Sequence, residues 1–218
     1  MRGPLFEKTS FIKSVTTRVR KLGGGTFSRV LLVKYKDEDA VLKVGLYNDN
    51  FHQQMFNNEA HVLFNLDGAG GAPRLIMAAV NSPMILMTYV PHPTLRDVLL
   101  QRTLQSQSQA LSMFRSMALA FAQVHELGYV HLDVKKDNIL VDITSDFKVY
   151  LIDFGKSCSQ GDRQGTSPKY NHHMLSIVSM APQPRKDVSS MSVLMEETFN
   201  FLTTDSISDL DPNIFSLC

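Results

Sequence analysis

The sequence of residues 129–140 is Tyr-Val-His-Leu-Asp-Val-Lys-Lys-Asp-Asn-Ile-Leu, and that of residues 149–155 is Val-Tyr-Leu-Ile-Asp-Phe-Gly. In the first stretch an aspartate, a lysine two places on and an asparagine five places on lie between apolar runs. In the second stretch an aspartate ends an apolar run directly before Phe-Gly. Such short apolar runs predict strands, and polar residues at strand ends lie where loops meet. We therefore expect the four polar side chains to gather at one site.

The chemistry of these four side chains suits phosphoryl transfer. Asp133 can accept a proton from an incoming hydroxyl, and Lys135 can neutralise a moving phosphoryl group. Asn138 and Asp153 supply hard oxygen ligands of the kind that Mg²⁺ prefers. Either motif alone is more often an ordinary turn or a solvated loop, so their order along one chain carries the interpretation.

Together the two motifs resemble those of the eukaryotic protein kinase family. Residues 131–138 are similar to its catalytic loop, and residues 153–155 to its metal-binding Asp-Phe-Gly. The resemblance implies one domain with an α+β, bilobal fold. It places a small antiparallel-sheet N-lobe with one helix at about 16–87, a hinge at 88–91, and a mainly helical C-lobe at 92–218. It also implies ATP and Mg²⁺ as cofactors and a protein substrate.

A glycine cluster at residues 22–30, Leu-Gly-Gly-Gly-Thr-Phe-Ser-Arg-Val, lies between two β-prone runs and predicts a hairpin with a flexible tip. Glycines let backbone N–H groups approach phosphate oxygens closely. A plain turn is the alternative interpretation of three glycines. The cluster is similar to the family's glycine-rich loop, except that Ser28 stands where the third glycine belongs.

Lys43 lies within an apolar strand predicted at 39–44, and a buried lysine needs an anionic partner. An exposed lysine whose stem covers the sheet is the alternative. The resemblance assigns Lys43 to the ATP phosphates and pairs it with Glu59, the one acidic residue of the helix predicted at 51–66.

The remaining site residues follow from the resemblance alone. Met87 falls at the back of the adenine pocket, and the hinge binds adenine through its backbone. The implied catalytic residues are Asp133 and Lys135, and the implied metal ligands are Asn138 and Asp153. The implied nucleotide-binding residues are Leu22, Gly23, Gly25, Val30, Val41, Lys43, Glu59, Met87, Tyr89, Val90 and Leu140.

The large lobe is expected to contain three helices in the chain as given. One starts after a Thr94 cap, and one covers residues 110–125 with a core stripe of Leu111, Phe114, Met117, Ala118 and Phe121. The third starts at Asp187, expected to cap it, and in the family this aspartate holds the catalytic-loop backbone.

Several positions depart from the family pattern. Leu132 replaces the arginine that clamps a phosphorylated activation segment, so activity should not depend on phosphorylation at Thr166, Ser157 or Ser159. The family's Ala-Pro-Glu is absent, since His-His-Met stands at 172–174 and Ala-Pro-Gln at 181–183.

The sequence turns polar after Leu202, so we also expect the chain as given to lack the last helices of the family. This leaves an apolar flank on the third helix, to be covered by Phe199, Phe201, Ile214 and Phe215 or by a partner. Residues 1–15 predict no defined element.

Composition excludes several classes of function. The chain of 218 residues suits one domain, and its net charge of +1 favours neither nucleic acid nor an anionic membrane. Two cysteines form no disulfide framework, and the sequence contains neither a signal-peptide core nor an apolar run of about 20 residues. We therefore expect a cytoplasmic or nuclear protein that is not secreted. His172 and His173 lack a third ligand at metal-binding spacing.

Three functions remain open. An active serine/threonine protein kinase is favoured by the complete polar set and by Lys135, which favours Ser or Thr hydroxyls. A pseudokinase that binds nucleotide or a partner without turnover is favoured by the shortened lobe, Ser28 and Leu132. A small-molecule kinase of the aminoglycoside phosphotransferase sort shares the Asp-to-Asn spacing, but Lys135 and the glycine cluster count against it.

Overall fold

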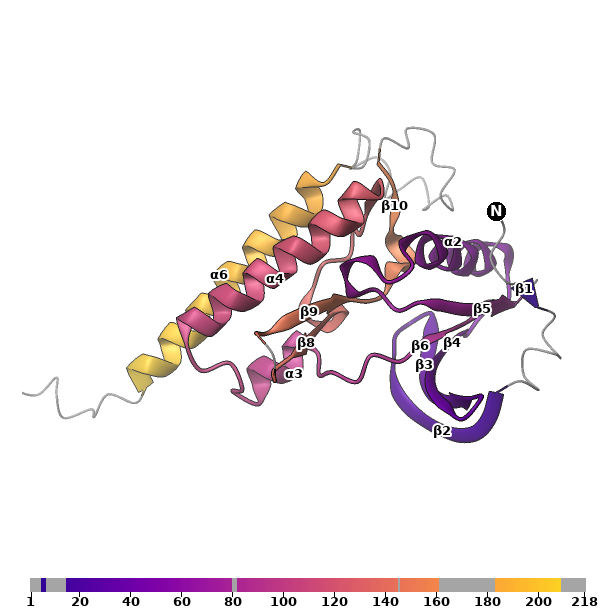
Figure 1. Cartoon of the computed structure of the whole chain (residues 1–218), viewed down its shortest axis with the longest axis horizontal. Helices are drawn as coiled ribbons and strands as arrows, with labels where there is room; N and C mark the ends of the chain where they lie inside the picture. Colours follow the sequence, from indigo (N-terminus) through magenta and orange to yellow (C-terminus); the bar gives the residue numbers. More distant parts are fainter. Residues whose placement is uncertain (1–4, 7–14, 80–81, 145, 161–182, 209–218) are drawn as a thin grey trace, which may run out of the picture.

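The computed structural model describes residues 5–6, 15–79, 82–144, 146–160 and 183–208. These residues form two lobes, a sheet lobe with one long helix and a helical lobe that carries two short two-stranded sheets (Figure 1). The bilobal α+β fold expected from the sequence is confirmed.

The sheet lobe is a six-stranded sheet in the order β1-β5-β6-β4-β3-β2. The five strands from β2 to β6 pair in antiparallel fashion, as predicted. Their alternating apolar residues form a small core on one sheet face, around Val33, Met77 and Leu86. The strands are β2 (Val15–Gly24), β3 (Ser28–Tyr35), β4 (Glu38–Gly45), β5 (Leu75–Ala79) and β6 (Met84–Thr88).

The sequence did not predict the sixth strand, β1 (Leu5–Phe6). It pairs in parallel with β5, so that Leu5 lies opposite Ala78 and Phe6 opposite Ala79. Two residues are too few to show a period-2 pattern, and their partners lie about 70 positions along the chain. Pairing of this kind leaves no signal in the sequence.

The helix α2 (Asn50–Leu66) packs on the other side of β5 and β6. Asp49 caps it by accepting the N–H of His52, and Asp67 ends it in the left-handed conformation. The predicted face of Phe56, Ala60 and Leu63 is buried. Phe64 is only half-buried, and the buried face contains Val62 and Leu66 instead. The same helix carries Glu59 into the interior.

The helical lobe begins at α3 (Leu95–Leu100), which Thr94 and Asp97 start with a capping box. The long helix α4 (Gln107–Glu126) follows. The remaining elements are η1 (Ala69–Gly71), β7 (Tyr129–Val130), η2 (Lys136–Asn138), β8 (Ile139–Asp142), β9 (Lys148–Leu151), η3 (Phe154–Lys156), β10 (Cys158–Ser159) and α6 (Arg185–Ser208). β7 pairs with β10, and β8 with β9, both in antiparallel fashion.

The buried face of α4 differs from the prediction. Leu111 is 56% exposed and Ala118 is also exposed, whereas Phe114, Met117 and Phe121 are buried as expected. The observed face begins one residue earlier and keeps the three- and four-residue spacing of a helix. Its members are Ala110, Met113, Phe114, Met117, Ala120, Phe121 and Val124.

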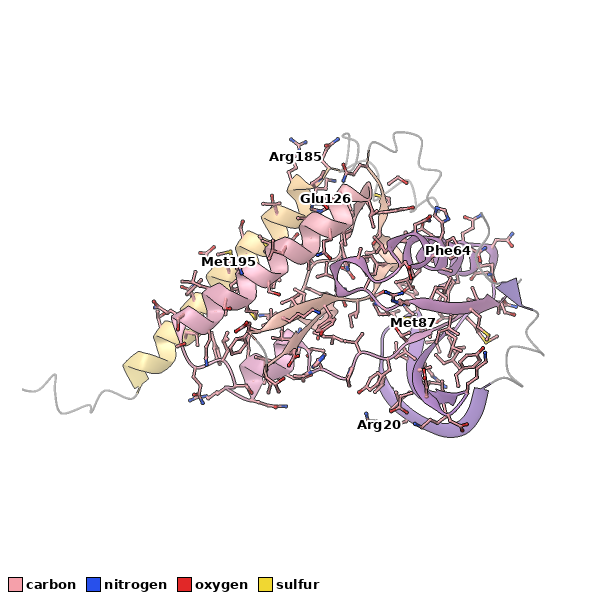
Figure 2. The ribbon with its side chains drawn as sticks, in the orientation of Figure 1. Arg20, Phe64, Met87, Glu126, Arg185 and Met195 are labelled. Carbon is pink, nitrogen blue, oxygen red and sulfur yellow. The ribbon has the colours of Figure 1, made fainter. Side chains whose placement is uncertain are left out.

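The helix α6 lies beside α4 and runs antiparallel to it, since Glu126 at the end of α4 and Arg185 at the start of α6 lie at the same end of the pair (Figure 2). The ring of Phe199 stacks on Phe114 with centroids 6.2 Å apart. α6 begins at Arg185, so the predicted cap at Asp187 is wrong and this residue lies in the first turn.

Two exposed valines of α6, Val188 at 48% and Val193 at 54%, fit the predicted apolar flank. Phe199 and Phe201 pack against the core as expected, while Ile214 and Phe215 lie outside the described residues. A partner that covers this flank stays a prediction. Among the described helices, none combines the length and the apolar character that a membrane span requires.

Candidate active site

The first part of the site joins the two lobes through Lys43. Its ammonium donates to both carboxylate oxygens of Glu59, at 2.8 and 2.7 Å, and to Oδ1 of Asp153 at 2.7 Å. β4 supplies the lysine, α2 the glutamate, and the turn before η3 the aspartate. Lys43 and Glu59 are 8% and 3% exposed, so the predicted anionic partner is present and the alternative of an exposed lysine is wrong.

Burial and charge oppose each other in this cluster. Burial lowers the pKa of Lys43, but the two carboxylates outweigh it and raise the pKa above its ordinary value. Burial also favours a higher pKa for Asp153, yet the adjacent Lys43 ammonium holds that pKa below its usual range. These two directions favour an ammonium facing an ionised Asp153. Burial raises the pKa of Glu59 above its ordinary value in spite of the adjacent Lys43. The cluster therefore places one ammonium between two carboxyl groups.

The second part of the site surrounds Asp133. Asn138 donates from Nδ2 to the backbone oxygen of Asp133 at 2.9 Å and to its Oδ2 at 3.0 Å. Lys135 donates to the same Oδ2 at 2.8 Å, and Lys156 donates to Oδ1 at 2.8 Å. Burial favours a higher pKa for Asp133, but the contacts from Lys135 and Lys156 outweigh it and hold the pKa below its ordinary value. The carboxylate is thus ionised and fixed on both oxygens.

The backbone that carries Asp133 is held from behind by Asp187, which is 1% exposed. Its two oxygens accept the N–H groups of His131 and Leu132 at 2.8 and 2.9 Å, and Oδ2 also contacts Nε2 of His125 at 2.9 Å. Leu132 has a φ of 63°, in the left-handed region that costs an ordinary residue energy. The contact of Asp187 with the loop backbone agrees with the prediction.

His131 is buried beside the loop and holds its backbone, as expected for a supporting residue. Burial lowers its pKa and favours the neutral ring. Its Nδ1 accepts the N–H of Asp133 at 3.2 Å, which leaves Nε2 to donate to the backbone oxygen of Ile152 at 3.0 Å. The ring also packs on Phe154 with centroids 4.7 Å apart. One neutral histidine therefore ties the strand ends of Asp133 and Asp153 together.

Strand pairing places several predicted nucleotide-binding residues in order. Gly23 pairs with Val30, Val30 with Lys43, and Val41 with Met87. Met87 is buried at the junction of the two lobes (Figure 2). Tyr89 and Val90 are half-buried in the connection after β6, Leu140 is buried in β8, and Leu22 is 38% exposed. The nucleotide-binding role of all these residues stays a prediction.

The tip of the β2–β3 hairpin closes through Gly25, whose N–H donates to Ser28 O at 3.0 Å. Side chains at Gly23 and Gly25 would meet open space, but a Cβ at Gly24 would lie 2.9 Å from Ser28 O. The turn itself therefore requires Gly24, and open space at the other two is what an approaching phosphate would need. Phe27 at the tip is 49% exposed.

The residues predicted as metal ligands suit Mg²⁺ by chemistry. Asn138 uses its amide nitrogen on Asp133, which leaves its side-chain oxygen for a cation. The Asp153 side chain is 42% exposed and its Oδ2 is the oxygen that Lys43 does not take. No group of three or more His, Cys, Asp or Glu side chains within the described ranges could hold a metal. The histidine pair at 172–173 lies outside these ranges.

The site contacts of Lys156 and Asn58 were not predicted. Lys156, directly after Asp-Phe-Gly, contacts Asp133 from 23 positions away, and Asn58 donates from Nδ2 to the backbone oxygen of Ser157 at 2.8 Å. A lysine adjoining the motif was a visible signal, but nothing in its spacing identifies the partner. Asn58 adjoins Glu59 on α2, so one turn of helix holds both Lys43 and the segment after η3.

Comparison with known proteins agrees with this geometry. A family model described as the protein kinase domain matches residues 16–187. The chain belongs to the protein kinase family.

Relatives of this kinase-family chain carry serine/threonine-protein kinase names. The serine/threonine-protein kinase WARTS homolog of Caenorhabditis elegans is 28% identical over 200 residues, which is 84% of this chain and 21% of the relative. The serine/threonine-protein kinase CBK1 of Saccharomyces cerevisiae is 26% identical, over 86% of the chain and 24% of the relative. The serine/threonine-protein kinase DBF20 of the same yeast is 30% identical over 142 residues, which is 62% of this chain and 25% of the relative. The kinase-family chain thus spans about a fifth to a quarter of the length of these relatives.

Proposed function

We propose that the protein transfers the terminal phosphoryl group of ATP, with Mg²⁺, to Ser or Thr hydroxyls of other proteins. The observation that supports this best is the convergence of two polar clusters, Lys43–Glu59–Asp153 and Asp133–Lys135–Asn138, from residues spread over more than a hundred positions. Phosphoryl transfer depends mainly on positioning and charge stabilisation, which such clusters supply.

Each residue has a separate task in this proposal. Lys43, oriented by Glu59, binds phosphate oxygens, and residues 88–91 bind adenine through the backbone. Asp133 accepts the hydroxyl proton, and Lys135 neutralises charge on the moving group. Asn138 and Asp153 would hold Mg²⁺, which neutralises phosphate charge when bound.

One observation favours the alternative of a pseudokinase. Lys156 occupies Oδ1 of Asp133 at 2.8 Å while Lys135 and Asn138 occupy Oδ2, so the base is fully engaged before any acceptor arrives. If Lys156 never left Asp133, the protein would bind nucleotide without transferring phosphate.

Two measurements separate these functions. The active kinase is expected to transfer labelled phosphate from ATP to itself or to serine and threonine peptides. Saturating ATP and Mg²⁺ should also raise the thermal midpoint, since ligand at 100 times its Kd stabilises by about 2.7 kcal/mol. Asp153→Asn should abolish transfer, whereas Glu38→Gln at an exposed site of β4 should not. Stabilisation by ATP without any transfer would support the pseudokinase and contradict the kinase.

Activity should not require phosphorylation of the segment after η3. Leu132 provides no guanidinium for a phosphate, and Ser157 is 1% exposed with its hydroxyl donating to His131 O at 3.1 Å. Ser157 is therefore a poor phosphorylation site, and Thr166 lies outside the described residues. Phosphatase treatment is expected to change the initial rate by less than about twofold. A large drop in rate after treatment would show that a phosphate matters.

A further inference from the structure

Lys156 is the residue of the site that the proposed function leaves without a task. It ends η3, directly after Gly155, and its ammonium contacts Oδ1 of Asp133 at 2.8 Å. Oδ2 of the same carboxylate takes Lys135 and Asn138. An acceptor hydroxyl must come within about 3 Å of a carboxylate oxygen to donate its proton. Oδ1 is the oxygen that Asn138 leaves accessible, so Lys156 stands where the acceptor has to bind.

Lys156 is able to leave. Its side chain is 48% exposed, and a flexible lysine in an exposed ion pair is held weakly. The Asp133 side chain is only 14% exposed and is held by a hydrogen bond from Asn138. When an acceptor binds, we therefore expect Lys156 to move and the Asp133 carboxylate to stay in place. The displaced ammonium remains tethered to η3, within reach of the acceptor.

The two sides of the site differ in their ratio of cations to carboxyl groups. Around Lys43 one ammonium lies between the two carboxyl groups of Glu59 and Asp153. Around Asp133 two cations, Lys135 and Lys156, share one carboxylate.

The neighbouring charges do not cancel this excess among the described residues. Asp137 is engaged by Arg96 at 2.6 and 2.7 Å, and Lys136 is engaged by Glu197 at 2.7 Å. The side of the site that meets the acceptor is therefore short of one negative charge.

We propose that Lys156 determines acceptor specificity: it holds Asp133 until an acceptor binds and then pairs with an acidic group beside the acceptor serine or threonine. The inference rests on the proposed function and names its substrate class, an acidic peptide segment. An ion pair with a half-exposed lysine gives a preference of about fivefold at most.

The test compares two synthetic peptides that share one serine, flanked by glutamates in one and by glutamines in the other. The unaltered protein is expected to phosphorylate the glutamate peptide with about threefold to fivefold higher kcat/KM, mainly through KM. Lys156→Gln should abolish this preference and Lys156→Arg should keep it. Lys148→Gln, which removes an equal charge at an exposed site of β9, should also keep it.

Other outcomes overturn the proposal. Equal rates for the two peptides, or an unchanged preference in Lys156→Gln, exclude an acidic acceptor at Lys156. If Lys156→Gln lowers kcat equally for both peptides, the Lys156 ammonium acts on the moving phosphoryl group and not on the acceptor.

A second measurement needs no turnover. Acetylation of lysines by acetic anhydride, followed by mass spectrometry, should label Lys156 more slowly in the unaltered protein than in Asp133→Asn, with Lys148 unchanged. Equal labelling of Lys156 in both proteins overturns the proposal. Suppose that Lys156 is labelled slowly but the protein phosphorylates neither peptide. The contact of Lys156 with Asp133 is then supported, whereas the proposed function and the acceptor preference are both overturned.

Discussion

Asp133→Asn is expected to lower the rate of phosphoryl transfer by about 10²–10⁴-fold, the usual contribution of a general base. An amide cannot take the acceptor proton, although it can still accept a hydrogen bond from Asn138. The contacts of Lys43 with Glu59 and Asp153 do not involve Asp133. Nucleotide binding should therefore persist, as measured by the shift of the thermal midpoint with ATP and Mg²⁺.

The matched control is Asp137→Asn, which removes the same charge from η2. Asp137 is exposed and pairs with Arg96, away from the acceptor oxygens of Asp133. Exposed ion pairs contribute about 0–1 kcal/mol, so this variant should retain most of the rate. If Asp133→Asn transfers phosphate at the original rate, Asp133 is not the general base of the reaction. Equal losses in both variants would point to a general effect of charge.

The sequence predicted the polar site better than it predicted the packing around it. Asp133, Lys135 and Asn138 lie within six residues, so one loop conformation brings them together, and Asn138 donates to Asp133. Glu59 was predictable because a buried lysine needs an anion and the neighbouring helix offers only one.

The remaining features depend on distances along the chain that no local pattern records. Lys156, at the end of η3, contacts Asp133 from 23 positions along the chain. Leu111 was placed in the core because it is apolar, yet the buried face of α4 begins at Ala110. Asp187 was expected to cap a helix that starts two residues earlier, and its carboxylate serves the loop backbone instead.

Asp187→Ala is expected to destabilise the folded protein by about 3–5 kcal/mol, the cost of removing one partner from a buried charged network. The substitution leaves the N–H groups of His131 and Leu132 without their acceptors in a buried position. It also releases the left-handed backbone of Leu132, which directly precedes Asp133. Urea unfolding should show a lower midpoint, and kcat should fall because Asp133 is no longer held in place.

Asp187→Asn separates the hydrogen bonds from the charge. Its one oxygen can accept one of the two backbone N–H groups, while its amide would oppose the other, so its stability should lie between those of Asp187→Ala and the unaltered protein. Glu196→Gln, on the exposed side of α6, should change stability by less than about 0.5 kcal/mol. If all three variants unfold at the same urea concentration, the catalytic loop is held by its own strand pairing and Asp187 contributes little.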